Sequence, residues 1–200
     1  DAGLFFDRPF TFAGLSAVQT LEPRIYYFRQ GFEDQDHLPV FDSTSLSIDY
    51  AQLFRNNRFV GLDRIADADQ LTIGVTSRFL SSTNGREVLS MSIGQVEQFS
   101  DSRVKLLNNP LANRQPQGSA LAGEVSAQLS PRWRIIANEV WDYEDSRWQE
   151  LGATLGYRGD NKHLFNIGFR KRAQEDVEQA ELSVYWPIGK KLGVMARWHY

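Results

Sequence analysis

The sequence contains no cysteine among its 200 residues, so no disulfide bond or thiol chemistry exists within this stretch. It also lacks any apolar run close to the about 18 residues that a transmembrane helix needs, and its mean hydropathy is −0.42. These absences argue against a membrane-spanning helix within these residues, but not against a membrane protein. A transmembrane strand needs only about 9–11 residues, half of which face lipid, so membrane barrels look polar on average.

The sequence has no excess of basic residues. Its 22 Lys and Arg residues against 25 Asp and Glu residues give a formal net charge of −3, which argues against a nucleic-acid-binding surface because such surfaces are basic. The chain begins with Asp1 and shows neither an initiator Met nor a signal peptide with its basic segment. We therefore expect either a mature protein or a piece of one.

The C-terminal part, from Ala120 to Tyr200, reads as six short segments in which apolar and polar residues alternate. A period of two predicts β-strands with two unlike faces. On the apolar face of these segments, the only charged residues are Glu139 and Lys171. The apolar positions are Leu121, Gly123, Val125, Ala127, Leu129, Trp133, Ile135, Ala137, Trp141, Tyr143, Leu151, Ala153, Leu155, Tyr157, Phe165, Ile167, Phe169, Ala180, Leu182, Val184, Trp186, Ile188, Leu192, Val194, Ala196, Trp198 and Tyr200.

Aromatic residues on this apolar face lie near the ends of the expected strands. They are Trp133, Trp141, Tyr143, Tyr157, Trp186, Trp198 and Tyr200. Rings at both ends of an apolar band suit the two interfaces of a lipid bilayer. The alternation alone also fits a water-soluble β-sandwich that acts as a binding module, so the aromatic placement is what favours a membrane.

Four further strands are expected in the N-terminal part, which makes ten in up-and-down order. They cover residues 2–10, 19–30, 70–81 and 87–98. Pro23 lacks an N–H, so we expect a bulge or local distortion in the second strand. Asn84-Gly85 predicts a hairpin between the third and fourth strands. Residues 11–18 read as a small-residue connection, and a short helical turn is expected near residues 49–54.

The two long connections, residues 31–69 and 99–119, both fall on one side when the connections are assigned alternately to the two ends of the strands. The connections at the opposite end are all short. Long loops outside and short turns on the periplasmic side are typical of outer-membrane barrels. The apolar and aromatic residues of 31–69 favour a packed loop over a disordered one.

One long segment resembles a known family. It runs FDSTSLSIDYAQLFRNNRFVGLDRIADADQLTIGVTSRFL over residues 41–80, is preceded by QTLEPRIYYFRQ at 19–30 and is followed by SIGQ at 92–95. The sequence is similar here to the LPS-assembly protein family of the bacterial outer membrane (LptD, also called organic solvent tolerance protein). The similarity continues through SPRWRI to the last residues and covers nearly the whole chain.

The resemblance implies a mainly β protein, a segment of a large transmembrane β-barrel in the bacterial outer membrane. It implies translocation of lipopolysaccharide (LPS) and its insertion in the outer leaflet, with no catalysis and no cofactor. The implied partners are LPS, the lipid bilayer, a plug lipoprotein in the barrel lumen (LptE) and a periplasmic bridge protein that binds a missing N-terminal jellyroll domain. The family chain is several times longer, and its adjacent cysteine pair would lie beyond residue 200.

In a barrel, the polar face lines the lumen. The lumen-facing candidates are Arg134, Asn138, Asp142, Arg158, Asn166, Arg170, Glu181 and Arg197. We expect Gly61, Asp63 and Arg64 to form a structural loop motif, with Arg64 pairing to a nearby carboxylate. The basic cluster at 170–172 has two readings, contacts with LPS phosphates or an ordinary solvated strand end. Glu139 conflicts with a lipid-facing position, unless a bulge, a register slip or a protein neighbour accommodates it.

Three competing interpretations are weaker. A hydrolase would need a nucleophile and base, yet no G-x-S-x-G is present and the three histidines are scattered. The pairs Asp34/Asp36 and Asp67/Asp69 lack the order of a calcium-binding loop, so solvated loop charge is favoured. A small self-contained outer-membrane channel or adhesin barrel is the main alternative. It requires strand 2–10 to pair with strand 191–200.

Overall fold

The computed structural model describes residues 1–200 except 13, 47, 107–118, 144–145, 174–176 and 190. In the described part, thirteen strands and one short 3₁₀ helix follow one another along the chain. They are β1 (Ala2–Gly3), β2 (Phe6–Phe12), β3 (Leu15–Gln30), β4 (Thr44–Ser45), η1 (Gln52–Phe54), β5 (Phe59–Val60), β6 (Ala68–Ser81), β7 (Glu87–Gln98), β8 (Ala120–Ser130), β9 (Trp133–Asp142), β10 (Arg147–Arg158), β11 (Leu164–Arg172), β12 (Val177–Ile188) and β13 (Leu192–His199).

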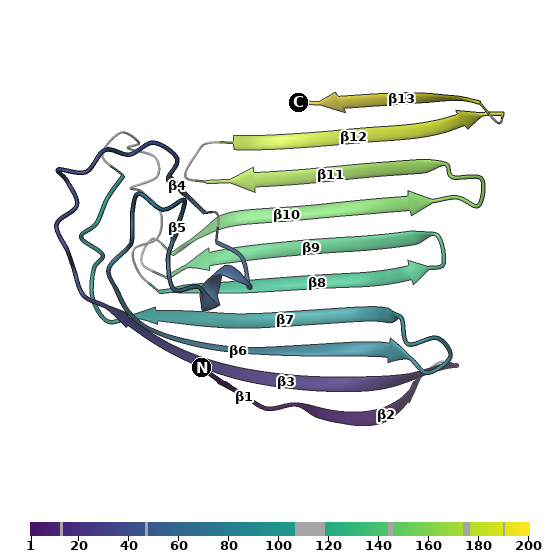
Figure 1. Ribbon diagram of the computed structural model, residues 1–200. Helices are drawn as coiled ribbons and strands as arrows, with labels where there is room; N and C mark the ends of the chain where they lie inside the picture. Colours follow the sequence, from purple (N-terminus) through teal and green to yellow (C-terminus); the bar gives the residue numbers. More distant parts are fainter. Residues whose placement is uncertain (13, 47, 107–118, 144–145, 174–176, 190) are drawn as a thin grey trace.

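All strands except β4 and β5 form one open antiparallel sheet (Figure 1). Its order is β1-β3-β6-β7-β8-β9-β10-β11-β12-β13, with β2 also paired to β3, so β1 and β2 are two parts of one edge strand. Ten strands therefore lie side by side in up-and-down order, as expected. The edge strand β1–β2 and the strand β13 lie at opposite edges and do not pair. The open sheet has the architecture of a segment of a larger barrel.

No helix in the described ranges is both long enough and apolar enough to span a membrane.

Pro23 interrupts the edge strand without shifting its register. Gly3 pairs with Arg24 and Phe6 pairs with Leu21, so the pairing is the same on both sides of the break. The amide of Leu4 still donates to the carbonyl of Pro23 at 3.0 Å. Since the N–H and C=O of one strand residue point to the same neighbour, the missing donor faces the edge strand, and Pro23 keeps its pairing with Val75 in the ladder to β6. The expected bulge is wrong, but the local distortion is confirmed.

The connection assigned to residues 11–18 is wrong: β2 and β3 run through it and leave a tight turn that includes Gly14 with φ of 82°. Glycine suits that turn because it has no Cβ to clash at positive φ. The expected helical turn near 49–54 is confirmed as η1, where the Asp49 carboxylate accepts the Gln52 amide at 2.8 Å.

The long connections lie at one end of the sheet and the hairpin turns at the other (Figure 1). We call these the loop end and the turn end. Residues 31–67 and 99–106 lie at the loop end, whereas residues 82–86 and 159–163 lie at the turn end. Residues 107–118 of the second expected loop lie outside the described residues. The expected sorting of connections holds for the described part of the chain.

Candidate functional site

The alternation predicted for residues 120–200 is realised as two faces of one sheet. Cross-strand partners share a face, and the register places Val125 opposite Ala137, Ala137 opposite Ala153, and Ala153 opposite Phe169. The predicted apolar positions therefore form one continuous surface, which we call the apolar face. Its exposed side chains include Ile25, Ile73, Ile93, Ile167, Trp186, Val194 and Trp198. A large exposed apolar surface of this kind needs an apolar environment or a covering partner.

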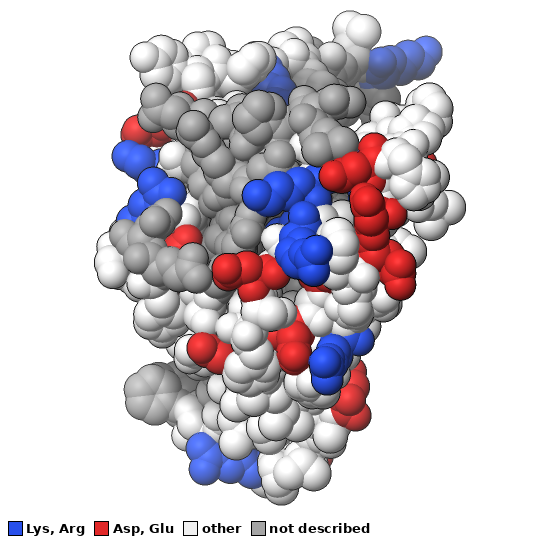
Figure 2. Space-filling model, turned by 90° about the vertical axis from the view of Figure 1, so that its left-hand side faces the viewer, with Lys and Arg blue, Asp and Glu red and all other residues white. Residues whose placement is uncertain are grey.

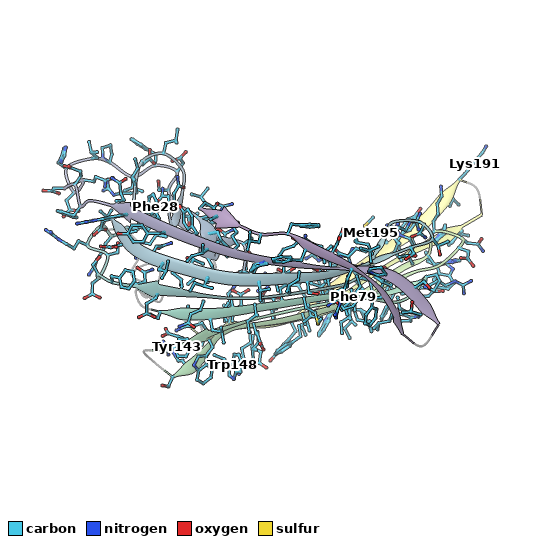
Figure 3. The ribbon with its side chains drawn as sticks, turned by 90° about the horizontal axis from the view of Figure 1, so that it is seen from below. Phe28, Phe79, Tyr143, Trp148, Lys191 and Met195 are labelled. Atoms are coloured by element: carbon cyan, nitrogen blue, oxygen red, sulfur yellow. The ribbon has the colours of Figure 1, made fainter. Side chains whose placement is uncertain are left out.

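Aromatic pairs lie at both ends of the apolar face. At the loop end, the rings of Trp141 and Trp148 are 4.9 Å apart, and at the turn end those of Trp133 and Tyr157 are 4.8 Å apart. Figure 3 shows Tyr143 and Trp148 on the side of the sheet opposite the long connection that follows β3. Two bands of rings that bracket an aliphatic surface have the arrangement of a wall that meets lipid at two interfaces.

Glu139 lies on the apolar face, with neither a bulge nor a register slip at its position. It pairs with Gly123 on one side and Leu151 on the other, in line with its apolar neighbours. Its side chain extends across Gly123, where an added Cβ would lie 3.1 Å from Oε1. Glu139 is exposed, and it lies one outward-facing position from Trp141. It therefore sits close to the loop-end aromatic pair, where an outward charge costs least.

The opposite surface, which we call the polar face, carries all eight lumen-facing candidates. Register places them together across β9 to β13: Arg134, Asn138, Asp142, Arg158, Asn166, Arg170, Glu181 and Arg197. Neighbouring polar groups pair with several of them. Asp142 is buried and accepts a hydrogen bond from Gln149 at 2.7 Å, while Arg197 contacts Glu181 at 2.6 Å. The arrangement is a hydrogen-bonded polar surface.

The basic cluster at 170–172 is divided between the two faces. Lys171 lies on the apolar face and its Nζ is 3.4 Å from Glu178. Arg172 lies on the polar face, with Nε 3.5 Å from Glu150. Arg170 also lies on the polar face, and its side chain has no hydrogen bond or ion pair with any described residue. The three residues therefore do not act as one site.

The loop that follows β3 folds back over the polar face. Leu53 and Phe54 of η1 are buried against Val96, Ala120 and other small residues of the sheet. The loop approaches closely because two paired strand positions are glycines: a Cβ on Gly74 would lie 2.8 Å from the Phe54 ring. The hydroxyl of Thr72 donates to the carbonyl of Leu53 at 2.7 Å. The packed loop was predicted, but its packing on the paired glycines Gly74 and Gly94 was not, although glycine inside strands signals close backbone approach.

The expected structural motif shapes the tip of this loop. Gly61 has φ of 93°, and a Cβ there would lie 2.7 Å from an Asp42 carboxylate oxygen. Asp63 accepts the amides of Phe41 and Asp42, both at 2.8 Å. Arg64 is 1% exposed and donates to the carbonyl of Leu38 at 3.0 Å. Its described partners are backbone carbonyls, where a carboxylate was expected.

Asp67 joins the two long loops. Its carboxylate accepts the hydroxyl of Ser102 at 2.7 Å and the amides of Arg103 and Val104 at 2.8 Å and 2.9 Å. Sequence reasoning assigned Asp67 to solvated loop charge, and that is wrong because the residue is only 8% exposed. Phe59, Ala66, Val104 and Leu106 form a small apolar cluster beside this contact.

The pKa values in this loop follow from these contacts. Burial raises the pKa of Asp67, but the hydrogen bonds from Ser102, Arg103 and Val104 outweigh it and hold the pKa below its ordinary value. At the tip, backbone amides lower the pKa of Asp63, and the hydrogen bond to Asp63 raises the pKa of Asp42. Asp67 is therefore held as the charged acceptor of the loop contact.

The fold and its two faces define a class of protein, a segment of the wall of a transmembrane β-barrel with a loop packed on its polar face. Figure 2 shows Lys, Arg, Asp and Glu side chains interspersed over the described surface of the loop end. No group of three or more potential metal ligands occurs in the ranges that the structure describes.

Comparison with known proteins identifies the family. The family model described as LptD, LPS transport system D, matches residues 1–192. The chain is 41% identical over 200 residues to the LPS-assembly protein LptD of Nitrosococcus oceani, and 38% identical over 202 residues to that of Thiobacillus denitrificans. It is 39% identical over 233 residues to that of Pseudomonas aeruginosa. The chain belongs to the LptD family of transport and assembly proteins. All of the chain is covered in each comparison, but it spans only about a quarter of these relatives.

Proposed function

We propose that this chain forms part of the barrel wall of an outer-membrane protein that translocates lipopolysaccharide and inserts it in the outer leaflet. The observation that carries the proposal is an open, two-faced sheet in a chain whose residues 1–192 match the LptD family model. Relatives that match the chain are named LPS-assembly proteins. The role is transport, with no bond chemistry.

The open edges support a segment over a self-contained small barrel. That alternative requires residues 2–10 to pair with residues 191–200, whereas the two segments lie at opposite edges of the sheet. Unpaired strand edges expose backbone N–H and C=O groups, which lipid does not tolerate. Further strands must therefore continue the wall at both edges.

The two faces suggest how the wall works. The apolar face contacts the lipid of the Gram-negative outer membrane, and the polar face with its eight candidates lines a wet lumen. That lumen holds the plug lipoprotein (LptE) and gives passage to polar sugars. The periplasmic bridge protein docks on the N-terminal domain of the full-length chain. The loops 31–69 and 99–119 cap the barrel on the extracellular side.

A depletion experiment tests the function. A Gram-negative strain is depleted of its own LPS-assembly protein and supplied with the full-length chain that contains this segment. Newly made LPS is expected to reach the cell surface only when that chain is present, as measured by labelling of surface LPS. The depleted strain without the chain is the control, and failure of the supplied chain to restore surface LPS would contradict the proposal.

A labelling experiment tests the orientation of the wall. Leu62 at the loop end is 93% exposed, and Asp160 lies in a turn at the other end. In intact cells, a membrane-impermeant maleimide is expected to label Leu62→Cys but not Asp160→Cys. Permeabilised cells are expected to show labelling of both, with the unsubstituted chain as background. Labelling of Asp160→Cys in intact cells would reverse the orientation.

A further inference from the structure

Charge on the polar face of β10 to β13 is unbalanced. Two of the arginines are paired with carboxylates, Arg172 with Glu150 and Arg197 with Glu181. Arg170 and Arg158 are exposed and have no hydrogen bond or ion pair from their side chains to any described residue. Exposed cations without a counter-charge on one face attract anionic groups of a ligand.

Arg170 lies at the edge of a shallow trough in this face. The trough has a volume of about 420 Å³ and is lined by side chains of β10 to β13, among them Thr154, Asn166, Arg170, Gln179, Glu181 and Arg197. Gly168 lies among them and has no side chain, so the surface of the trough is recessed at this position. The Arg197–Glu181 pair lies on the far side, with side chains 65% and 44% exposed. Such an exposed pair rearranges at little cost.

We infer that this trough binds a phosphate-bearing saccharide, with Arg170 as the residue that contacts the phosphate. The guanidinium group offers paired N–H donors that match phosphate oxygens, and hydrogen bonds between charged groups are the strong ones. The amides of Asn166 and Gln179 supply neutral donors and acceptors for hydroxyl groups. This inference rests on the proposed function and names the part of the lipid that this wall contacts.

A second cation extends the surface toward the turn end. Arg158 lies on β10, and Arg170 of β11 pairs with Gly152 of β10. Gly152 and Arg158 are six residues apart along β10, so the two arginines are separated by the same length of strand. At the rise of an extended strand that is about 20 Å, a span of several sugar units. Arg158 therefore offers a second phosphate contact on the same face.

The lining favours a saccharide over a protein surface. Protein interfaces centre on aromatic, Met and aliphatic side chains that fill pockets. The two large or apolar residues at the trough, Phe169 and Ala180, belong to the apolar face and contribute little from the polar side. The remaining lining is polar and exposed, which suits a hydrated ligand that must also leave.

Binding of two matched probes tests the inference. The purified full-length chain, with its plug partner, is titrated with delipidated phosphorylated core oligosaccharide of LPS, and with the same oligosaccharide after its phosphate is removed by hydrofluoric acid. We expect the phosphorylated probe to bind about tenfold more tightly, the effect of one charge-assisted hydrogen bond. Arg170→Gln should abolish that difference, and Gln179→Glu should reduce it by repulsion. Lys171→Gln, next in sequence but on the apolar face, should retain it.

Three results would overturn the inference: equal or absent binding of the two probes, an unchanged preference in Arg170→Gln, or a photo-crosslinker at Gln179 that captures the plug protein and no oligosaccharide. The last result would make this face a protein interface. Surface LPS in the depletion assay separates the two proposals. Normal LPS delivery without probe binding contradicts only the proposal for the trough, whereas failure of the chain to restore LPS delivery contradicts the proposed function itself.

Discussion

The carboxylate of Asp67 accepts a hydrogen bond of 2.7 Å from the hydroxyl of Ser102, 35 residues further along the chain. Because Asp67 directly precedes β6 and Ser102 follows β7, this contact joins the two long connections at the same end of the sheet. Amides of the next two residues add to it. The second loop is thus held at its start by one side chain of the first.

Neutralising this carboxylate should loosen the second loop. We expect Asp67→Asn to destabilise the loop contact by about 1–3 kcal/mol, because buried donors lose a charged acceptor. Hydrogen exchange in the full-length chain should show faster exchange at the amides of Arg103 and Val104. Asp101→Asn is the matched control, since Asp101 is exposed and has no described partner. Equal protection in both variants would rule out a role for Asp67.

The same contact should weaken in acid. The hydrogen bonds hold the pKa of Asp67 below its ordinary value, so its contribution is complete above the unfolded pKa of about 3.9 and is lost as pH falls through the lower folded pKa. The distribution of distances between spin labels at Leu38→Cys and Asp101→Cys should therefore broaden below about pH 4. In Asp67→Asn it should be broad at every pH. A narrow distance distribution that does not change over the whole acid titration would contradict this assignment.

The close packing of η1 on Gly74 can be tested by adding a side chain there. A Cβ on Gly74 would lie 2.8 Å from Cζ of Phe54 and 3.0 Å from the Tyr50 ring. We expect Gly74→Ala to displace the loop and cost about 1–3 kcal/mol, as overpacking does elsewhere. Proteolysis of loop 31–67 should accelerate. Gly31→Ala is the control, because nothing lies within 4 Å of its added Cβ. Similar cleavage rates would show that the loop does not rest on Gly74.

Adjacent residues of β11 test the two faces. Ile167 is 48% exposed on the apolar face, while Asn166 lies on the polar face. We expect Ile167→Arg to destabilise the membrane-inserted wall by about 2–4 kcal/mol, the cost of a lipid-facing arginine at mid-depth. Asn166→Arg should insert normally. Heat-modifiable migration of the full-length protein measures both. If Asn166→Arg were the damaging change, the assignment of faces would be reversed.

Most strand positions, and the faces of the strands after residue 120, were predictable from residues alone, whereas the strand ends at residues 11–18 and the loop contacts were not. Alternation is a local property, so Ala137, Ala153 and Phe169 could be assigned to one face without knowing their neighbours. Glu139 fits that alternation as well. The structure places it on the apolar face, as assigned from the sequence, with its carboxylate on the outward side of the sheet. Pro23 was expected to cause a bulge or a local distortion, and the distortion is found in the edge strand, the neighbour that its missing donor faces.

The sequence by itself determined a two-faced, up-and-down sheet, because side chains in an extended chain alternate whatever lies beside them. Its similarity also pointed to the family. Only the tertiary structure decided which cations have a partner: Arg172 pairs with Glu150, whereas the side chain of Arg170, two positions away, contacts no carboxylate among the described residues. It alone joined Asp67 to Ser102 and seated Phe54 above Gly74. Such contacts depend on register and chain reversal over tens of residues, and these are set by the packing of the whole sheet.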